Sequence, residues 1–194
     1  GGLAVHQVVH DVMGMGMVGE VIRERHAQFY LGVTNKNEDD WQRIELIYPQ
    51  IKHAWSKLPA TDVTAIDFVN ALETYQNRRA LWVDRLDWLD HSLKTARSVT
   101  DVKSEANILN EFGFVYSALG DKRPALDYYE QSLSLRRQVG DKSGEATTLN
   151  NVGSVYDDLG EKAKALEYYE QALPLQRQVG DKSGEATTLN NVGS

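Results

Sequence analysis

The segment GDKSGEATTLNNVGS occurs twice in this chain, at residues 140–154 and again without change at residues 180–194. The same spacing of 40 residues aligns residues 100–139 with residues 140–179 without a gap, with about half of the positions identical. A fixed period of this length is typical of stacked supersecondary units and not of one closed globule. The sequence therefore predicts an array of repeats.

One repeat is predicted to be a pair of helices, because apolar residues recur at steps of three and four. Gly160 should end the first helix, since glycine adopts the left-handed cap conformation at little cost. Gly180 and Asp181 should turn the chain into the next repeat. The predicted buried faces are Leu149, Val152, Val155, Tyr156 and Leu159 in the first helix, and Ala165, Leu166, Tyr169, Ala172, Leu173 and Leu175 in the second.

These residues resemble the tetratricopeptide repeat, in which two small residues allow the helices to approach closely. Gly153 and Ala165 occupy those two positions here. The period is longer than the usual one, as in the extended repeats of kinesin light chains and many bacterial sensor proteins. The resemblance implies an all-α fold, a right-handed superhelix of antiparallel helical hairpins with about nine helices in this chain.

Proline positions add two expectations about the helices of the array. Pro174 lies inside a predicted second helix and lacks a backbone donor, which costs about 3 kcal/mol in a helix interior. We therefore expect a kink there or an early end to the helix. Pro124 lies in a first turn, where proline is tolerated.

The composition excludes several classes of function. The formal net charge of -7 provides no broad basic surface for nucleic acid or an acidic membrane. The chain has no cysteine, so disulfides and thiolate metal sites are excluded, which fits a cytoplasmic protein. The apolar stretch before Val21 is interrupted by His6, His10, Asp11 and Glu20, and it is neither a signal peptide nor a membrane span.

Residues 3–58 resemble the segment that joins the winged helix to the repeat arm in STAND-class signalling ATPases of the NB-ARC type. His10 and Asp11 match the end of a Met-His-Asp motif, with Val9 in place of methionine. Residues 25–27 and Tyr30 match a following helix motif. The resemblance implies that His10 contacts a nucleotide. No glycine-rich phosphate loop occurs in this sequence, so the nucleotide-binding domain itself is absent.

The domain organisation follows from these two resemblances. Both ends of the sequence look cut, which suggests a fragment of a longer protein. We expect the end of a winged helix at 1–16, a helical linker at 17–59, a degenerate repeat at 60–99, full repeats at 100–139 and 140–179, and a partial repeat at 180–194. We expect the uncovered partial repeat to self-associate or to fray at residues 182–194.

Three motifs in the sequence resemble catalytic or cofactor sites only weakly, and none of them predicts an active site. His6 and His10 have the spacing of the zinc-protease pattern HExxH, but Gln7 replaces the glutamate that acts as general base. The acidic pairs at 39–40 and 157–158 are better explained as a helix-capping loop and a solvated rim. The glycines at 14–19 lack the strand before and the helix after that a phosphate loop has. We expect no enzyme, no cofactor and no metal site.

An asparagine recurs at the same position of each repeat, and two interpretations of it remain open. The ladder comprises Asn70, Asn110, Asn150 and Asn190, with Asn151 beside the third, and Phe114 and Ser154 lie one turn onward. In the tetratricopeptide family this part of the first helix lines the concave groove. A carboxamide there can both donate to and accept from a peptide backbone. Alternatively, each asparagine bonds the neighbouring helix and stabilises stacking.

Two functional hypotheses follow from this sequence. In the first, the repeats bind a protein or peptide as the ligand-sensing arm of a STAND-type ATPase. In the second, the chain is a free-standing tetratricopeptide scaffold that assembles other proteins. A phosphate loop encoded upstream in the native gene would distinguish the first hypothesis from the second.

Overall fold

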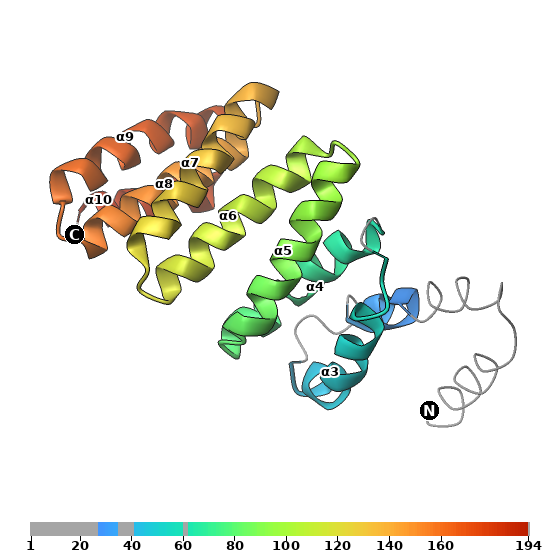
Figure 1. Cartoon of the computed structure of the whole chain (residues 1–194). Coiled ribbons are helices and arrows are strands. Elements are labelled where there is room, and N and C mark those ends of the chain that lie inside the picture. Colours follow the sequence, from blue (N-terminus) through green and yellow to red (C-terminus); the bar gives the residue numbers. More distant parts are fainter. Residues whose placement is uncertain (1–26, 35–40, 60–61, 194) are drawn as a thin grey trace, which may run out of the picture. The chain divides into compact units, whose positions relative to one another are not determined.

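The computed structural model describes residues 27–34, 41–59 and 62–193 of the chain. These residues form nine helices and no strand, so the predicted all-α fold is confirmed for the part described. The chain divides into two compact units, residues 1–95 and residues 96–194, with the boundary inside one helix. Figure 1 shows the helices of both units.

The first unit packs around a group of aromatic side chains. Its helices are residues 27–34, α3 (Trp41–Trp55), α4 (Thr64–Arg78) and most of α5 (Trp82–Ser98). The ring of Trp55 stacks on that of Trp88, with centroids 4.3 Å apart, and both side chains are buried. Stacked aromatic pairs of this kind stabilise the folded state by more than the burial of their apolar area alone provides. The two tryptophans therefore join α3 to α5.

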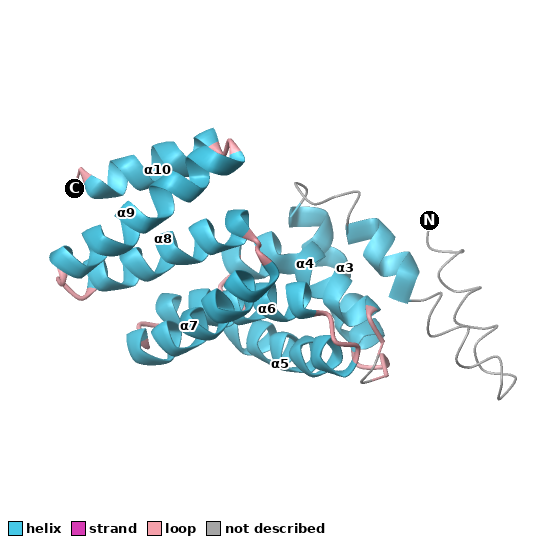
Figure 2. Cartoon of the chain, turned by 90° about the horizontal axis from the view of Figure 1, so that it is seen from above, coloured by secondary structure: helices cyan, strands magenta, loops and turns pink. Residues whose placement is uncertain are grey.

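The second unit is a row of helical hairpins. The unit contains α6 (Val102–Ala118), α7 (Lys122–Val139), α8 (Lys142–Asp158), α9 (Lys162–Val179) and α10 (Lys182–Val192). Helix α6 pairs with α7 and α8 with α9, while α7 also packs on α8 and α9 on α10. Figure 2 shows α10 beyond α9 at the outer edge of this row. The hairpins are therefore stacked in chain order, as the period predicted.

The helices end at the same register positions in each repeat. Helices α7 and α9 end on Gly140 and Gly180, whose φ angles of 71° and 73° are left-handed. The degenerate part of the array adopts the same conformation without glycine. There Ala80, 40 residues before the left-handed Gly120, has a φ of 51°. The 40-residue register therefore continues in the backbone into residues 60–99, where the sequence pattern is weak.

The close approach of the two helices in each hairpin depends on glycine, as the resemblance implied. A Cβ added to Gly153 would lie 2.5 Å from a ring carbon of Tyr169, and one added to Gly113 would lie 2.5 Å from a ring carbon of Tyr129. Both tyrosines are buried. The tyrosine ring of the second helix thus fills the space that the missing side chain of the first helix leaves.

Six residues of the predicted buried faces are confirmed as buried, three are half-buried (Tyr156, Leu173 and Leu175), and two were wrongly predicted. Leu149, Val152, Val155, Ala165, Tyr169 and Ala172 are buried. Leu159 was wrongly predicted to be buried, because it follows the last turn of α8 and points to solvent. The prediction that Leu166 is buried was also wrong, because this residue is 39% exposed. It lies on α9, and no further complete hairpin follows α9 in the described part of the chain. Its counterpart Leu126 packs on the core.

Helix α9 runs through Pro174 to Val179, so the early end that we expected at the proline does not occur. Pro174 is exposed. Water can therefore reach the carbonyl group that the proline leaves without a donor, which lowers the cost of the missing bond.

Several predictions lie outside the described residues. These are the histidine pair His6 and His10, the glycines at 14–19, the winged-helix remnant at 1–16 and the acidic pair at 39–40.

Candidate protein-binding surface

The first helices of the second unit, α6, α8 and α10, lie next to one another and are joined by the asparagine ladder. The Oδ1 atom of Asn110 accepts hydrogen bonds from Thr148 Oγ1 at 3.0 Å and from Asn151 Nδ2 at 3.2 Å. Because these partners are on α8, the carboxamide links two successive hairpins.

The next step of the ladder repeats this arrangement. The Oδ1 atom of Asn150 accepts from Thr188 Oγ1 at 3.0 Å and from Asn191 Nδ2 at 3.3 Å. The second interpretation required each asparagine to bond the neighbouring helix, and such hydrogen bonds are present at both steps. These bonds also fix the direction of the Asn151 and Asn191 side chains, which are only half-buried.

The other predicted site residues differ in exposure. Asn70 lies exposed on α4 in the first unit, and Asn190 lies exposed on α10. Phe114 is 39% exposed, and Ser154, at the same register position, is also exposed. Among the predicted site residues, a hydrogen bond joins Asn110 of α6 to Asn151 of α8, whereas Asn70 belongs to the other unit.

We define the first-helix face as the exposed and half-buried residues that share one register on these three helices. Its members are Asn107, Glu111 and Phe114 of α6, Thr147, Asn151 and Ser154 of α8, and Thr187 and Asn191 of α10. Amide and hydroxyl groups predominate, and these groups both donate and accept hydrogen bonds. One aromatic side chain, Phe114, provides an apolar contact. This composition suits an extended peptide backbone.

A buried guanidinium supports the α6 side of this face. The Arg136 side chain donates to Asn107 Oδ1 at 3.0 Å, to Ser132 Oγ at 3.0 Å and to Asp141 Oδ2 at 3.3 Å. Burial lowers the pKa of Arg136, and the charge of Asp141 opposes that shift. A guanidinium remains protonated under these conditions. Arg136 therefore holds the Asn107 carboxamide in place.

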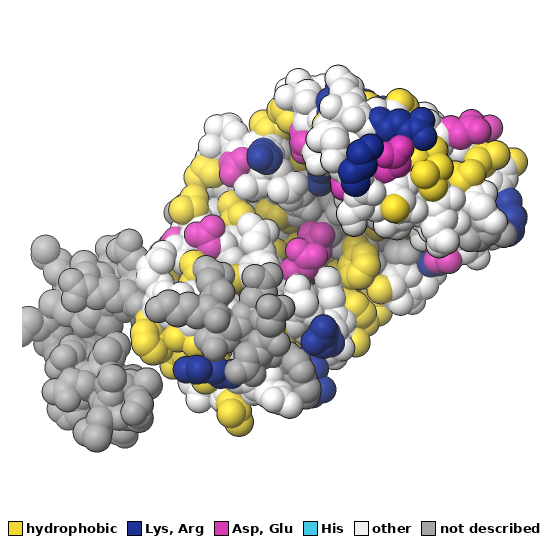
Figure 3. Space-filling view, turned by 180° about the vertical axis from the view of Figure 1, so that it is seen from behind, with side chains coloured by type: hydrophobic (Ala, Val, Ile, Leu, Met, Phe, Trp, Pro, Cys, Tyr) yellow, Lys and Arg dark blue, Asp and Glu magenta, His cyan; other side chains and the backbone are white. Residues whose placement is uncertain are grey.

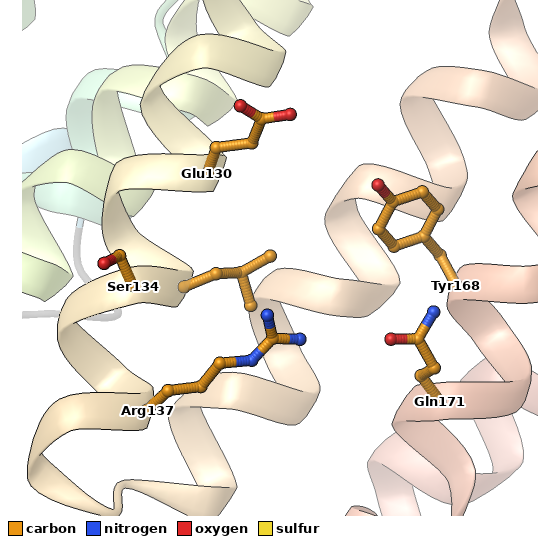
Figure 4. A pocket seen from close by; sticks show the side chains of 6 residues that line it. Glu130, Ser134, Arg137, Tyr168 and Gln171 are labelled. Atoms are coloured by element: carbon orange, nitrogen blue, oxygen red, sulfur yellow. The ribbon is translucent and has the colours of Figure 1, made fainter.

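A pocket of about 480 Å³ lies between the second helices α7 and α9, and the sequence interpretation missed it. Its lining residues are Glu130, Leu133, Ser134, Arg137, Tyr168 and Gln171. Figure 4 shows Glu130, Ser134 and Arg137 on one side and Tyr168 and Gln171 on the other. Burial raises the pKa of Tyr168, with smaller effects from Tyr156 and Glu130. The recurrence of arginine at 97, 137 and 177 was a signal that could have drawn attention to this side.

That arginine pairs with the first turn of the following helix in each repeat. The Nε atoms of Arg97, Arg137 and Arg177 lie 2.7, 2.8 and 2.6 Å from carboxylate oxygens of Glu105, Glu145 and Glu185. Burial acts to raise the pKa of Glu145, but hydrogen bonds from Arg137 and Lys142 lower it below its usual value. Glu145 is therefore ionised at neutral pH, and its charge is compensated.

The surface charge is mixed on the face that Figure 3 shows, where Lys and Arg side chains lie among Asp and Glu side chains. Within the described ranges, no group of three His, Cys, Asp or Glu side chains could hold a metal ion. No helix in those ranges is long and apolar enough to cross a membrane.

Comparison with known proteins identifies the repeats. The family model described as Tetratricopeptide repeat matches residues 104–178 and 144–194. No curated protein matches the chain.

Three solved structures with a similar fold have low sequence identity. A STAND protein with a tetratricopeptide repeat sensor from Pyrococcus horikoshii is 17% identical, with a TM-score of 0.69 over 97% of this chain and 29% of that one. Aspartyl phosphate phosphatase F from Bacillus subtilis is 11% identical, with a TM-score of 0.67 over 84% of this chain and 44% of that one. A putative kinesin light chain from Podosopora anserina is 12% identical, with a TM-score of 0.61 over 85% of this chain and 82% of that one.

The chain spans less than two thirds of the length of the first two of these structures. At these identities the likeness concerns the fold. The fold class is all-α, of the tetratricopeptide type with antiparallel helical hairpins, and residues 104–194 are tetratricopeptide repeats.

Proposed function

We propose that the chain is a protein- or peptide-binding repeat module that acts as the ligand-sensing arm of a STAND-type signalling ATPase. The ligand groove would include the predicted positions Asn70, Asn110, Phe114, Asn150, Asn151, Ser154 and Asn190. The role would be one of recognition and not of catalysis, and the module would work in the cytoplasm.

The observation that best supports peptide binding is that hydrogen bonds already hold side chains of the first-helix face in place. Asn151 and Asn191 are directed by hydrogen bonds to Asn110 and Asn150, so little side-chain entropy is lost when a ligand binds them. Under this proposal Asn110 and Asn150 orient their neighbours through their carbonyl oxygens. Phe114, Asn151 and Ser154 make the contacts with the ligand.

The STAND part of the proposal depends on the front of the chain. The similarity to the Pyrococcus horikoshii structure extends over 97% of this chain, and residues 3–58 resemble the linker of that class. A free-standing scaffold for protein assembly is the second candidate, and the kinesin light chain structure favours it, since 82% of that chain is covered.

Photo-crosslinking in living cells tests the location of the ligand groove. A photoreactive amino acid is placed at Phe114 or Ser154 on the first-helix face, and at Asp127 or Glu167 on the exposed side of the second helices as matched controls. Adducts with a discrete partner are expected only from the first two positions. Adducts only from the controls would place the ligand on the other side of the hairpins and contradict the proposal.

The native gene tests the STAND assignment independently. Its sequence upstream of the codon for Gly1 should encode a glycine-rich phosphate loop ending in Lys-Ser or Lys-Thr. If the gene lacks such a loop while the crosslinks appear as expected, the scaffold is the correct function.

A further inference from the structure

The pocket between α7 and α9 carries two opposite charges on one of its walls. Glu130 and Arg137 both line it from α7, and Figure 4 shows them on the same side of the pocket. They lie about two helical turns apart, which is a rise of about 10 Å. A ligand that contacts both side chains must therefore carry two opposite charges that are well separated.

The Arg137 guanidinium is held in position by the protein, but the protein uses only one of its nitrogen atoms. Its Nε atom donates to Glu145 Oε1 of α8 at 2.8 Å. Within the described residues the two terminal nitrogen atoms have no acceptor, and Figure 4 shows the guanidinium directed from α7 toward α9. These N–H groups form a planar fork that matches the two oxygens of a carboxylate. Arg137 can therefore bind the carboxylate group of a ligand.

Glu130 provides the opposite charge at the exposed rim of the pocket. Its carboxylate forms no ion pair in the part of the chain that the structure describes, so it can accept hydrogen bonds from an ammonium group. Both charges act on Tyr168 across the pocket. Burial has the largest effect and raises the pKa of Tyr168, the charge of Glu130 raises it further, and the charge of Arg137 lowers it.

The rest of the pocket combines an apolar wall with groups that bond a peptide unit. Leu133 is 5% exposed, and the ring of Tyr168 is half-buried. The Ser134 hydroxyl can donate a hydrogen bond. The amide nitrogen of Gln171 donates to Glu167 O at 3.0 Å, which leaves the side-chain oxygen of Gln171 as an acceptor. One peptide bond needs one donor and one acceptor, and these two side chains supply them.

We propose that this pocket binds a free dipeptide as a zwitterion, with its carboxylate on Arg137, its ammonium group on Glu130 and its second side chain against Leu133. An extended chain of two residues spans about 7 Å, and the hydrogen bonds at its ends cover the remaining distance between the two charges. A single amino acid has about half that span and cannot contact both. The volume of about 480 Å³ is within the usual range for small-ligand pockets.

A ligand with only one charge is a poor occupant of this pocket. An anion bound at Arg137 would leave the Glu130 carboxylate unpaired beside it, and a cation bound at Glu130 would have the same conflict with Arg137. The inference is independent of the proposed function, because the first-helix face lies on α6, α8 and α10 and contributes no residue to the pocket. Both walls are also internal to the row of helices, since α8 packs on α7 and α10 packs on α9.

The test is isothermal titration calorimetry of the 194-residue chain with the dipeptide alanyl-phenylalanine. Binding should saturate at one site with a Kd below about 1 mM. The N-acetylated dipeptide lacks the ammonium group, and the dipeptide amide lacks the carboxylate. Each should bind at least about tenfold more weakly, because a hydrogen bond to a charged group is lost. Free phenylalanine should bind as weakly as these two derivatives.

Variants of the chain then locate the binding site. Glu130→Gln and Arg137→Gln should each weaken binding of the dipeptide at least about tenfold. Glu170→Gln and Arg177→Gln change the same residue types one repeat further on, outside the pocket, and should bind as the unchanged chain does. Arg177 pairs with the first turn of α10 as Arg137 pairs with that of α8, so this control also accounts for the loss of an ion pair. Circular dichroism should show unchanged helix content in all four variants.

Three outcomes would overturn the inference. These are a Kd above about 1 mM for the dipeptide, equal binding of the acetylated or amidated derivative, and equal binding by the pocket variants and their controls. If the acetylated derivative binds equally well and Arg137→Gln abolishes that binding, the pocket is a site for anions only. That result would also overturn the inference.

Discussion

Replacing Asn110 by alanine should lower stability more than replacing its exposed counterpart Asn70. The Asn110 side chain is 7% exposed and its Oδ1 accepts two hydrogen bonds from α8. The Thr148 hydroxyl keeps an acceptor after the change, because Gly144 O lies 3.1 Å away. Asn151 is half-buried, so water can replace its lost partner. The net loss should therefore be about 1–2 kcal/mol, the range for hydrogen bonds of this kind.

The assay is urea unfolding followed by circular dichroism. With a slope of about 1–3 kcal/mol per molar urea, Asn110→Ala should lower the unfolding midpoint by roughly 0.3–2 M. Asn70→Ala should change the free energy of unfolding by less than about 0.5 kcal/mol, as is usual for exposed sites. A double-mutant cycle with Thr148→Ala should give a coupling energy of about 0.5–1.5 kcal/mol.

Equal stability of Asn110→Ala and Asn70→Ala, together with a mutant cycle that gives no coupling, would contradict this prediction. The hydrogen bonds between α6 and α8 would then contribute nothing to stacking. A loss of partner binding without a loss of stability would assign the Asn110 carboxamide directly to the ligand.

Three further predictions follow from single positions. Thr100→Gly should raise the free energy of unfolding by about 0.5–1 kcal/mol, because glycine relieves a left-handed φ of 55° that costs other residues about 1–2 kcal/mol; a loss of stability in thermal melts would contradict this. Gly153→Ala should cost about 1–3 kcal/mol, since the added Cβ lies 2.5 Å from the Tyr169 ring; a melting temperature equal to that of the unchanged chain would show that the ring can move. Glu145 has a lowered pKa in the folded chain, so its contribution to stability is present above the unfolded pKa and is lost as the pH falls through the folded value. The difference in stability between the chain and Glu145→Gln should therefore shrink on acidification, and a difference that is constant with pH would contradict the ion pair with Arg137.

Local features of the amino-acid sequence determined the architecture of the second unit. The 40-residue period, the glycines at the helix ends and the pairing of a small residue with a tyrosine all act within one hairpin. Gly153 and Tyr169 illustrate this, because the close approach of two helices demands both a missing side chain and a ring to fill its place. Such requirements can be identified from composition and spacing alone.

Only the tertiary structure decided how the asparagine ladder is used. The partners of Asn110 lie 38 and 41 residues away along the chain, so their orientation depends on how successive hairpins stack. The same holds for the pocket between α7 and α9, whose lining comes from two repeats. Residues 182–193 show the limit most clearly: they repeat residues 142–153 without change, yet Leu189 is exposed and Leu149 is buried. Burial is a property of the neighbouring elements, and identical sequences therefore cannot specify it by themselves.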